Sequence, residues 1–230
     1  GIAVWHIFVY LQWFFSRKIY MKIVFATGNS GKLREASEIL GEGFELVSLS
    51  QAGIEEDIPE TGNTLRANSL QKAQYLYDIC ACNCFADDTG LEVDALGGAP
   101  GVYTARYAGD DKDFNKDMDK VLRELEILES ERSMAAALGV KTKQPSRRAR
   151  FKSVITLIIN GEKHLFEGNL EGVIAREKSG KGGFGYDPIF IADEYPGMTL
   201  ADITEEQKNE ISHRGKALRA MAEWLKSQNL

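Results

Sequence analysis

The segment of residues 85–106, FADDTGLEVDALGGAPGVYTAR, constrains the fold of this chain more than any other. Two adjacent carboxylates, Asp87 and Asp88, end a short apolar run that has the length of a buried strand. Aspartates do not stabilise strands, and neighbouring carboxylates repel each other unless a positive charge lies beside them. Because side chains alternate along a strand, we expect Asp87 and Asp88 to point to opposite sides. One of them could then hold a hard metal ion or a water, while the other turns into the fold.

On the carboxylate pair alone, a solvated Asp-Asp-Thr-Gly turn is the better interpretation. The residues that follow favour a functional one, because Gly97, Gly98, Pro100 and Gly101 fix a tight backbone path. Such a path can bring the main chain close to a ligand.

The chain opens with a pattern of strand, glycine-rich turn and helix. Residues 22–26 form a short apolar run, TGNSG breaks it, and residues 32–40 carry apolar side chains at helical spacing. Free N–H groups at a helix start, together with Lys32, make a natural anion site. The segment TGNSGK is not a P-loop, because only two residues separate Gly28 from Gly31. A plain turn capped by Asn29 or Ser30 is an equally good interpretation.

Further elements follow at intervals that suit an α/β protein. We expect strands at residues 44–49, 82–86, 151–159, 163–167 and 170–176, and helices at 64–77, 110–133 and within 204–225. Asn160-Gly161 is a strong hairpin signal between two of these strands. Residues 133–150 are interpreted as an insertion or mobile loop whose basic run, Arg147, Arg148 and Arg150, is solvated.

Composition limits the partners of the chain. With 230 residues it can bury a sizeable core, and its net charge of -6 argues against generic binding to nucleic acid or to an anionic membrane. Cys80, Cys82 and Cys84 are a poor disulfide framework, and on one strand all three would face the same way. A thiolate metal site lacks a fourth ligand nearby. We therefore expect buried, reduced thiols in a cytoplasmic protein.

Residues 1–20, GIAVWHIFVYLQWFFSRKIY, differ from the rest of the chain. The segment is apolar and aromatic, but His6 and Gln12 interrupt it, and Arg17 and Lys18 follow the apolar run where a signal peptide would place them before it. We interpret residues 1–20 as an extension outside the folded domain, disordered or foreign to it, and residues 21–230 as the domain itself. A weak membrane anchor is the alternative.

Two later segments add ligand-binding chemistry. GKGGFGYDP places four glycines around Phe184 and Tyr186, with Asp187 held extended before a proline. Aromatic rings beside a carboxylate could stack on a nucleobase. The alternative interpretation is a glycine-rich lid whose aromatic side chains only fill space. Ser212, His213 and Arg214 supply several donors at one point, although a lone histidine is usually structural. Together, the anion site, the carboxylates and the aromatic loop suggest that the ligand is a nucleotide. Attack by a metal-activated water is the simplest chemistry for such a site.

Five ordered motifs connect the chain to a known family. TGNSGK, ETGNT with NSLQKA, FADDTGLEVDALGGAPGVYTARYAG, GGFGYDPIF and SHRGKAL closely resemble the non-canonical purine nucleoside triphosphate pyrophosphatases, the Ham1-like inosine and xanthosine triphosphatases. The resemblance runs from Met21 to about the C-terminus, and residues 133–150 look longer than the family's usual connection. It implies an ITPase-like α/β fold with a long twisted mixed sheet, two lobes, a central cleft and a homodimer.

The same resemblance implies an activity and its residues. The expected reaction is Mg2+-dependent hydrolysis of ITP, dITP or XTP to the monophosphate and pyrophosphate. Asp88 would be the general base and, with Glu60, a metal ligand, while Lys72 would neutralise phosphate charge. The remaining residues implied in substrate binding are Thr27, Gly28, Asn29, Lys32, Thr89, Phe184, Gly185, Tyr186, Asp187, Lys208, His213 and Arg214. Tyr186 stands where the family often has tryptophan and should still stack.

Two other functions stay open at this point. A Maf-like nucleotide pyrophosphatase shares the general architecture but prefers other bases, and a nucleotide-sensing module would bind without hydrolysing. Base preference separates the first from the Ham1-like enzymes, and pyrophosphate release separates both enzymes from the sensor.

Overall fold

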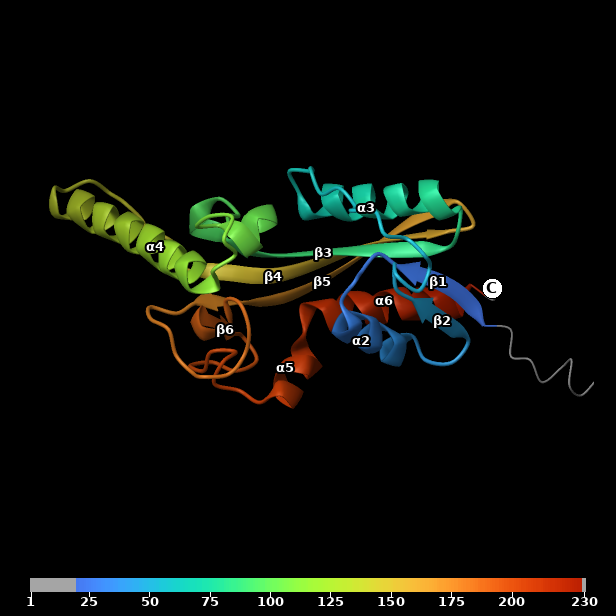
Figure 1. Ribbon diagram of the computed structural model, residues 1–230. Helices are drawn as coiled ribbons and strands as arrows, with labels where there is room; N and C mark the ends of the chain where they lie inside the picture. Colours follow the sequence, from blue (N-terminus) through green and yellow to red (C-terminus); the bar gives the residue numbers. More distant parts are fainter. Residues whose placement is uncertain (1–19, 229–230) are drawn as a thin grey trace, which may run out of the picture.

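The computed structural model describes residues 20–228 and contains a six-stranded mixed sheet with helices on both faces (Figure 1). The strands lie in the order β2-β1-β3-β4-β5-β6. β2, β1 and β3 run parallel, whereas β3, β4, β5 and β6 pair antiparallel. Their bounds are Met21–Phe25 (β1), Phe44–Val47 (β2), Cys84–Val93 (β3), Arg148–Ile159 (β4), Glu162–Ile174 (β5) and Phe190–Ala192 (β6). The predicted α/β fold with a mixed sheet is confirmed.

Each α-helix begins at a polar capping residue whose side chain accepts a hydrogen bond from the first turn. The α-helices are Ser30–Leu40 (α2), Leu65–Cys80 (α3), Phe114–Ala137 (α4), Glu205–Ile211 (α5) and His213–Ser227 (α6). The caps are Asn29, Thr64, Asp113, Thr204 and Ser212 in that order. Short 3-10 helices cover Asp94–Leu96, Gly101–Arg106 and Asp187–Ile189. The cap at Ser212 divides the expected C-terminal helical region in two.

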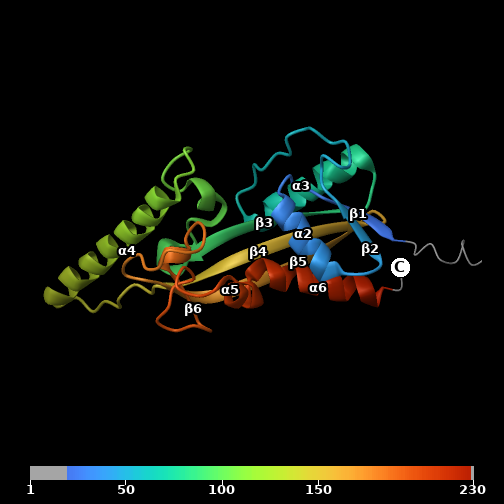
Figure 2. The same ribbon diagram turned by 60° about the horizontal axis from the view of Figure 1, so that its bottom comes forward.

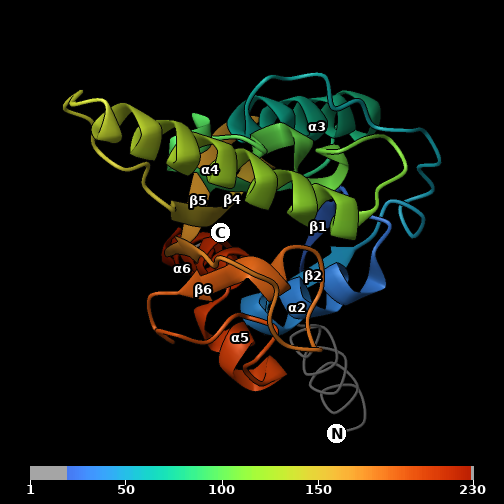
Figure 3. The same cartoon turned by 90° about the vertical axis from the view of Figure 1, so that its left-hand side faces the viewer.

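Alternation along β3 assigns its side chains to two cores. Phe85 packs with α2 and α6 on one face, and Ala86 packs with α3 on the other. Figures 1 and 2 show α3 on one side of the sheet and α2 with α6 on the opposite side. A third core gathers around Leu91, Val121 and Phe190 at the end of the sheet near α4 (Figure 3).

The hairpin between β4 and β5 forms as expected. Asn160 and Gly161 both have positive φ, 50° and 83°, which is the geometry of a two-residue turn of this kind. Ile159 pairs with Glu162 directly across it. The hairpin sets the register of the two longest strands.

Asp87 and Asp88 lie in the middle of β3 and not at its end, so that part of the prediction is wrong. β4 pairs with β3 continuously from Cys84 to Val93, and this ladder extends the strand through both carboxylates. The expectation that they face opposite sides is confirmed, because Asp87 contacts Lys32 on α2 while Asp88 faces Lys72 on α3.

The cysteine prediction is only partly right. Cys80 ends α3, and Cys80 and Cys82 form a disulfide across Ala81, whose left-handed conformation (φ 47°) brings their Cα atoms to 5.1 Å. The expectation of reduced thiols on one strand face is therefore wrong for this pair. Cys84 alone is free and buried in β3, where burial raises the pKa of its thiol to about 12.

The region of residues 133–150 is more ordered than a mobile loop. α4 continues to Ala137 and β4 begins at Arg148, so the irregular connection covers only residues 138–147. The basic run is not solvated as predicted, because Arg147 pairs with Glu129 at 2.7 Å and Arg148 with Asp193 at 2.7 Å. Arg150 contacts Asp94 at 3.1 Å. The ion pair of Arg147 attaches the end of the connection to α4, and the other two hold the start of β4.

The predicted extension, apart from Tyr20, lies outside the described residues. Between residues 20 and 228, no helix is both long and apolar enough to cross a membrane.

Candidate active site

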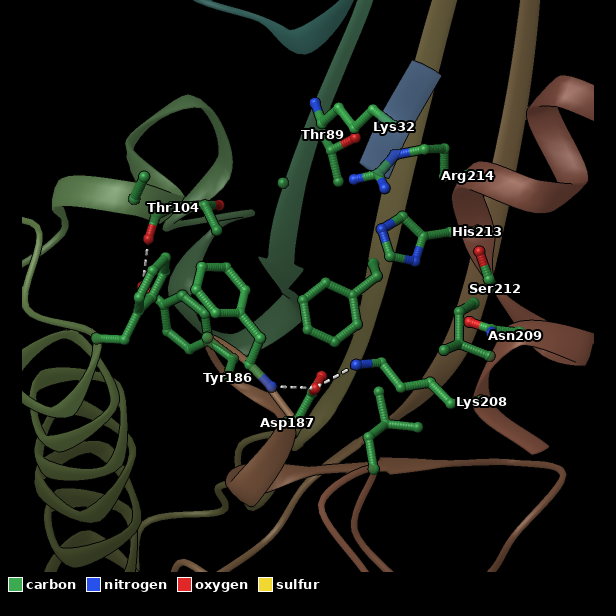
Figure 4. Close-up of a pocket in the computed structure, with 18 of the residues that line it drawn as sticks. Lys32, Thr89, Thr104, Tyr186, Asp187, Lys208, Asn209, Ser212, His213 and Arg214 are labelled. Atoms are coloured by element: carbon green, nitrogen blue, oxygen red, sulfur yellow. Dashed lines mark hydrogen bonds and ion pairs between the residues drawn. The ribbon is translucent and has the colours of Figure 1, made fainter. Parts of the chain in front are cut away.

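A pocket of about 500 Å3 opens between the third core and the α2/α6 side of the sheet (Figure 4). Its walls come from β3, β4 and the 3-10 helix Gly101–Arg106 on one side and from α2, α5 and α6 on the other. The loop before β6 closes one end. The pocket therefore exists only because segments distant in the sequence meet there.

Asp187 organises the glycine-rich loop at the pocket's edge. One of its oxygens, Oδ2, accepts hydrogen bonds from the backbone N–H of Phe184 and from Lys208 Nζ, both at 2.6 Å (Figure 4). A Cβ on Gly183 would lie 2.5 Å from that oxygen, and Gly183 also has a positive φ of 80°. Only glycine allows the loop to wrap around Asp187 in this way.

An aromatic wall lies beside the loop. Phe184 is 73% exposed and meets the edge of Phe114 at 4.8 Å between ring centroids. Tyr186 is only 2% exposed, and its hydroxyl donates to the carbonyl oxygen of Thr104 at 2.8 Å. Burial raises the pKa of Tyr186 above its usual value, so the phenol stays protonated. Phe184 is thus the ring available to a ligand, and Tyr186 is fixed in the wall.

His213 and Arg214 enter the pocket from the first turn of α6. The His213 imidazole stacks on Phe151 with 5.2 Å between centroids and 16° between planes. Burial lowers the pKa of His213 to about 3, and the neighbouring cations Arg214 and Lys208 add to this effect. His213 is therefore neutral at physiological pH, with its buried Nδ1 lacking a hydrogen-bond partner among the described residues. A neutral imidazole with a free nitrogen can accept from or donate to a ligand.

Lys32 and Arg214 share one buried carboxylate. Lys32 Nζ lies 3.0 Å and 3.3 Å from the two oxygens of Asp87, and Arg214 Nε lies 3.5 Å from one of them. Arg214 also contacts Glu35 at 3.2 Å. Burial alone would raise the pKa of Asp87, but Lys32 and Arg214 outweigh it and lower that pKa.

A second charged cluster lies on the α3 side of β3. Lys72 Nζ contacts Glu60 Oε1 at 2.5 Å and Asp88 Oδ1 at 3.6 Å. Burial opposes the charge of Lys72, but the attraction of Asp88, Asp87 and Glu60 raises its pKa. Burial also raises the pKa of Asp88; Lys72 counteracts this, while the nearby Glu60 adds to it. Asp88 is thus a carboxylate that binds a proton more readily than usual.

The two clusters meet at an open edge of β3. β1 pairs with β3 only at Cys84 and Phe85, so in the described part of the chain β1 leaves the edge of Asp87 and Asp88 uncovered. Asp87 lies close enough to Lys72 for that lysine to lower its pKa across the strand. Lys32 and Lys72 therefore lie on opposite faces of the same stretch of β3.

The turn before α2 adds backbone donors near this edge. Asn29 caps the helix by accepting from Lys32 N at 3.0 Å, and its own N–H donates to Thr27 Oγ1 at 3.1 Å. A Cβ at Gly28 would meet nothing within 4 Å, so the space above the turn is open. The alternative of a capped turn is correct as geometry, and it leaves room for an anion.

The structure brings most of the predicted site residues into one pocket. Those that line it are Lys32, Thr89, Phe184, Gly185, Tyr186, Asp187, Lys208, His213 and Arg214. Thr27, Gly28 and Asn29 lie in the turn before α2, and Glu60, Lys72 and Asp88 form the cluster on the other face. Glu35, Phe114 and Phe151 also line the pocket and were not predicted. No local pattern distinguishes them, since each reaches the pocket through tertiary packing.

Glu60 and Asp88 suit a divalent cation. Asp88 Oδ2 is buried without a hydrogen-bond partner in the described residues, and the two carboxylates share only the charge of Lys72. Residues 20–228 contain no cluster of three or more His, Cys, Asp or Glu side chains placed for a metal. A cation here would need ligand oxygens from elsewhere, which is how Mg2+ binds in many nucleotide sites, through one or two carboxylates and substrate phosphates.

Comparison with known proteins agrees with this arrangement. The model of the Ham1 family matches residues 23–224. A dITP/XTP pyrophosphatase of Flavobacterium psychrophilum is 45% identical over 207 residues, which are 90% of this chain and 100% of the relative. The enzyme of the same description from Bacillus subtilis is 41% identical over 211 residues, covering 91% and 99% of the two chains. A solved HAM1 protein from Coxiella burnetii superposes with a TM-score of 0.78 at 36% identity, over 90% of this chain and 99% of that one. The chain belongs to the Ham1 family.

Proposed function

We propose that this protein hydrolyses the non-canonical purine nucleoside triphosphates ITP, dITP and XTP to the monophosphate and pyrophosphate. The observation that carries the proposal is the position of the pocket. It joins an aromatic and hydrogen-bonding end at Phe184, His213 and Arg214 to a cationic end at Lys32, next to the carboxylates of β3. Related Ham1 proteins described as dITP/XTP pyrophosphatases support this substrate class.

The cationic end would hold the triphosphate. Lys32 contacts Asp87 on β3, the first turn of α2 offers backbone N–H groups, and Thr27, Gly28 and Asn29 form the turn before it. Lys72, on the other face, would neutralise charge that develops on the phosphates. Its raised pKa keeps this ammonium group protonated at neutral pH.

Glu60 and Asp88 would bind Mg2+, together with phosphate oxygens of the substrate. When bound, Mg2+ neutralises phosphate charge and acidifies a bound water. Asp88 would take a proton from the attacking water, because its Oδ2 atom has no hydrogen-bond partner among the described residues and can accept one. The water oxygen would bond to the α-phosphorus as the bond from that phosphorus to the bridging oxygen of the β-phosphate breaks, and pyrophosphate leaves with the bridging oxygen.

The aromatic end would select the base. Arg214 and the neutral His213 can donate to the 6-keto oxygen of hypoxanthine or xanthine, whereas the 6-amino group of adenine would leave these buried donors unpaired. Phe184 offers an exposed face for stacking, with Thr89 and Gly185 lining the same pocket. Asp187, Lys208 and the buried Tyr186 would hold this end in shape.

The biological setting follows from the proposed activity. Removal of deaminated purines from nucleic acid precursors belongs in the cytoplasm, where these precursors are made. We further propose that residues 21–230 act as one domain and that two copies associate. Light scattering after gel filtration tests the dimer, and a mass of one chain at micromolar concentration contradicts it.

The function is tested by Mg2+-dependent pyrophosphate release from ITP, XTP, dITP, GTP, ATP and dUTP. We expect fast release from the first three, loss of release with EDTA and recovery with added Mg2+. Preference for other bases would indicate the Maf-like activity. Tight nucleotide binding without release would indicate a sensing module and remove the basis for metal binding by Glu60 and Asp88.

A further inference from the structure

The proposed reaction gives no role to Asp87, although it is the most buried carboxylate of the site. Its side chain is 3% exposed, and it lies between two helices of the α2/α6 face. Lys32 from α2 contacts both of its oxygens, and Arg214 from α6 approaches one of them. Removing a charge from water to this extent is costly unless the partners compensate for it.

The two partners of Asp87 serve different parts of the substrate. Lys32 belongs to the phosphate end of the pocket, and Arg214 belongs to the base end with His213. Figure 4 shows Lys32 and Arg214 next to each other, with His213 beside Arg214 at the start of α6. One carboxylate thus connects the groups that would bind phosphate and read the base.

The two contacts differ in quality. Lys32 Nζ is 3.0 Å from Asp87 Oδ2, within hydrogen-bond range. Arg214 Nε is 3.5 Å from the same oxygen, and this buried N–H has no hydrogen-bond partner within the described chain. The lysine therefore occupies the carboxylate more fully, and the arginine is left with a longer contact.

We infer that Asp87 is a positioning residue that couples phosphate binding to base recognition by sharing its charge between Lys32 and Arg214. This inference rests on the proposed function. A polyphosphate near Lys32 draws the ammonium group towards itself, which frees the Asp87 carboxylate for Arg214. The guanidinium group is then held more firmly in the orientation that meets the base.

The coupling has a defined sign and a measurable size. Phosphate binding increases affinity for the base end, and by thermodynamic reciprocity base binding increases affinity for phosphate. Couplings between sites are commonly on the order of 5- to 150-fold in affinity. We expect a value of about fivefold or more here, because the two cations share a single carboxylate.

The test uses two fragments of the substrate, inosine and tripolyphosphate, so it does not depend on turnover. The affinity for inosine is measured by ligand-observed NMR with and without saturating tripolyphosphate. We expect tripolyphosphate to improve it about fivefold or more in the natural protein and to have no effect in Asp87→Asn. The same loss is expected in Lys32→Met, because the competition needs both cations.

The matched control is Glu129→Gln. Glu129 is likewise one carboxylate shared by two cations, Arg147 at 2.7 Å and Arg176 at 3.0 Å, but it does not line the pocket. This variant should keep the full coupling. The ratio of kcat/KM for ITP over ATP should fall in Asp87→Asn and stay unchanged in Glu129→Gln.

The outcomes separate the inference from the proposed function. A natural protein that releases pyrophosphate from ITP but shows no effect of tripolyphosphate on inosine binding overturns the role of Asp87, as does full coupling in a folded Asp87→Asn. A natural protein that releases no pyrophosphate contradicts the proposed function instead. If Asp87→Asn does not fold, the natural protein and Lys32→Met decide the question.

Discussion

Gly168 controls where α6 lies on the sheet, and adding one methyl group there should disturb the base end of the pocket. A Cβ at this position in β5 would lie 2.1 Å from the carbonyl oxygen of His213, 2.6 Å from Ala217 N and 2.9 Å from Lys216 Cβ. The first two contacts are with backbone atoms, which cannot rotate away. Gly168→Ala must therefore move α6, the helix that carries His213 and Arg214.

The size of the movement follows from these contacts. Extending the 2.1 Å separation from the His213 carbonyl oxygen to an ordinary contact of 3.4 Å requires a displacement of about 1.3 Å. Overpacking of this kind costs about 1–3 kcal/mol in the free energy of unfolding. Misplacing a recognition group by about 1 Å can reduce the rate about 100-fold. We expect kcat/KM for ITP to fall by about that factor.

The matched control is Gly172→Ala on the same strand. A Cβ there would lie 2.2 Å from the carbonyl oxygen of Ile191 and 2.8 Å from the ring of Phe190, so the clash is similar but involves β6. Both variants should lower the thermal midpoint by about 2–4 °C per kcal/mol. The ratio of kcat/KM for ITP over ATP should fall more in Gly168→Ala than in Gly172→Ala, because the first moves the helix that carries His213 and Arg214, whereas β6 reaches the pocket through the loop before it. An unchanged ratio in a folded Gly168→Ala would refute the view that α6 packing positions the base-reading residues.

Three further predictions concern single groups. Asp88→Asn should abolish pyrophosphate release yet raise the thermal midpoint in metal-free buffer near pH 8. Folding raises the pKa of Asp88, so above that pKa the charged carboxylate destabilises the folded state, and the neutral amide removes this cost. A lower thermal midpoint in the variant would contradict this sign. Folding lowers the pKa of His213 from 6.5 to about 3, so the free energy of unfolding should decrease as the pH falls below about 6.5. Denaturant titrations at several pH values should show a smaller decrease in His213→Asn. A titration midpoint of His213 between pH 5 and 8 in NMR spectra of the folded protein would disprove this prediction. Tyr186→Phe removes the hydrogen bond to the carbonyl oxygen of Thr104 and should lower the free energy of unfolding in urea by about 1 kcal/mol. An unchanged urea midpoint would show that this hydrogen bond does not stabilise the fold.

Several local features could be predicted from the sequence because they depend on neighbouring residues. The Asn160-Gly161 turn, the helix after TGNSG and the opposite directions of Asp87 and Asp88 follow from backbone preferences and from the alternation of a strand. The ordered motifs also indicated the family, which the comparisons confirm. The roles of individual site residues stay predictions, since they come from resemblance and not from local geometry.

Tertiary structure decided the features that depend on pairing between distant segments. β4 continues β3 through its two carboxylates, so they lie inside the strand and not at its end. The basic run at residues 147–150 is held by acids on other elements, and the turn at Ala81 brings Cys80 and Cys82 together. No local pattern encodes these contacts.

The residues of the pocket likewise separate into those that local sequence brings together and those that only tertiary packing brings together. Local sequence placed Gly183 and Asp187 in one loop and His213 with Arg214 at one helix start. Only the folded chain adds Phe114 and Phe151 to the wall and joins Lys32 to Arg214 through Asp87. The sequence by itself thus determined the parts and the family. Packing of α2, α4 and α6 against the sheet decided how those parts meet, because contact energies between distant segments are fixed only when the chain has folded.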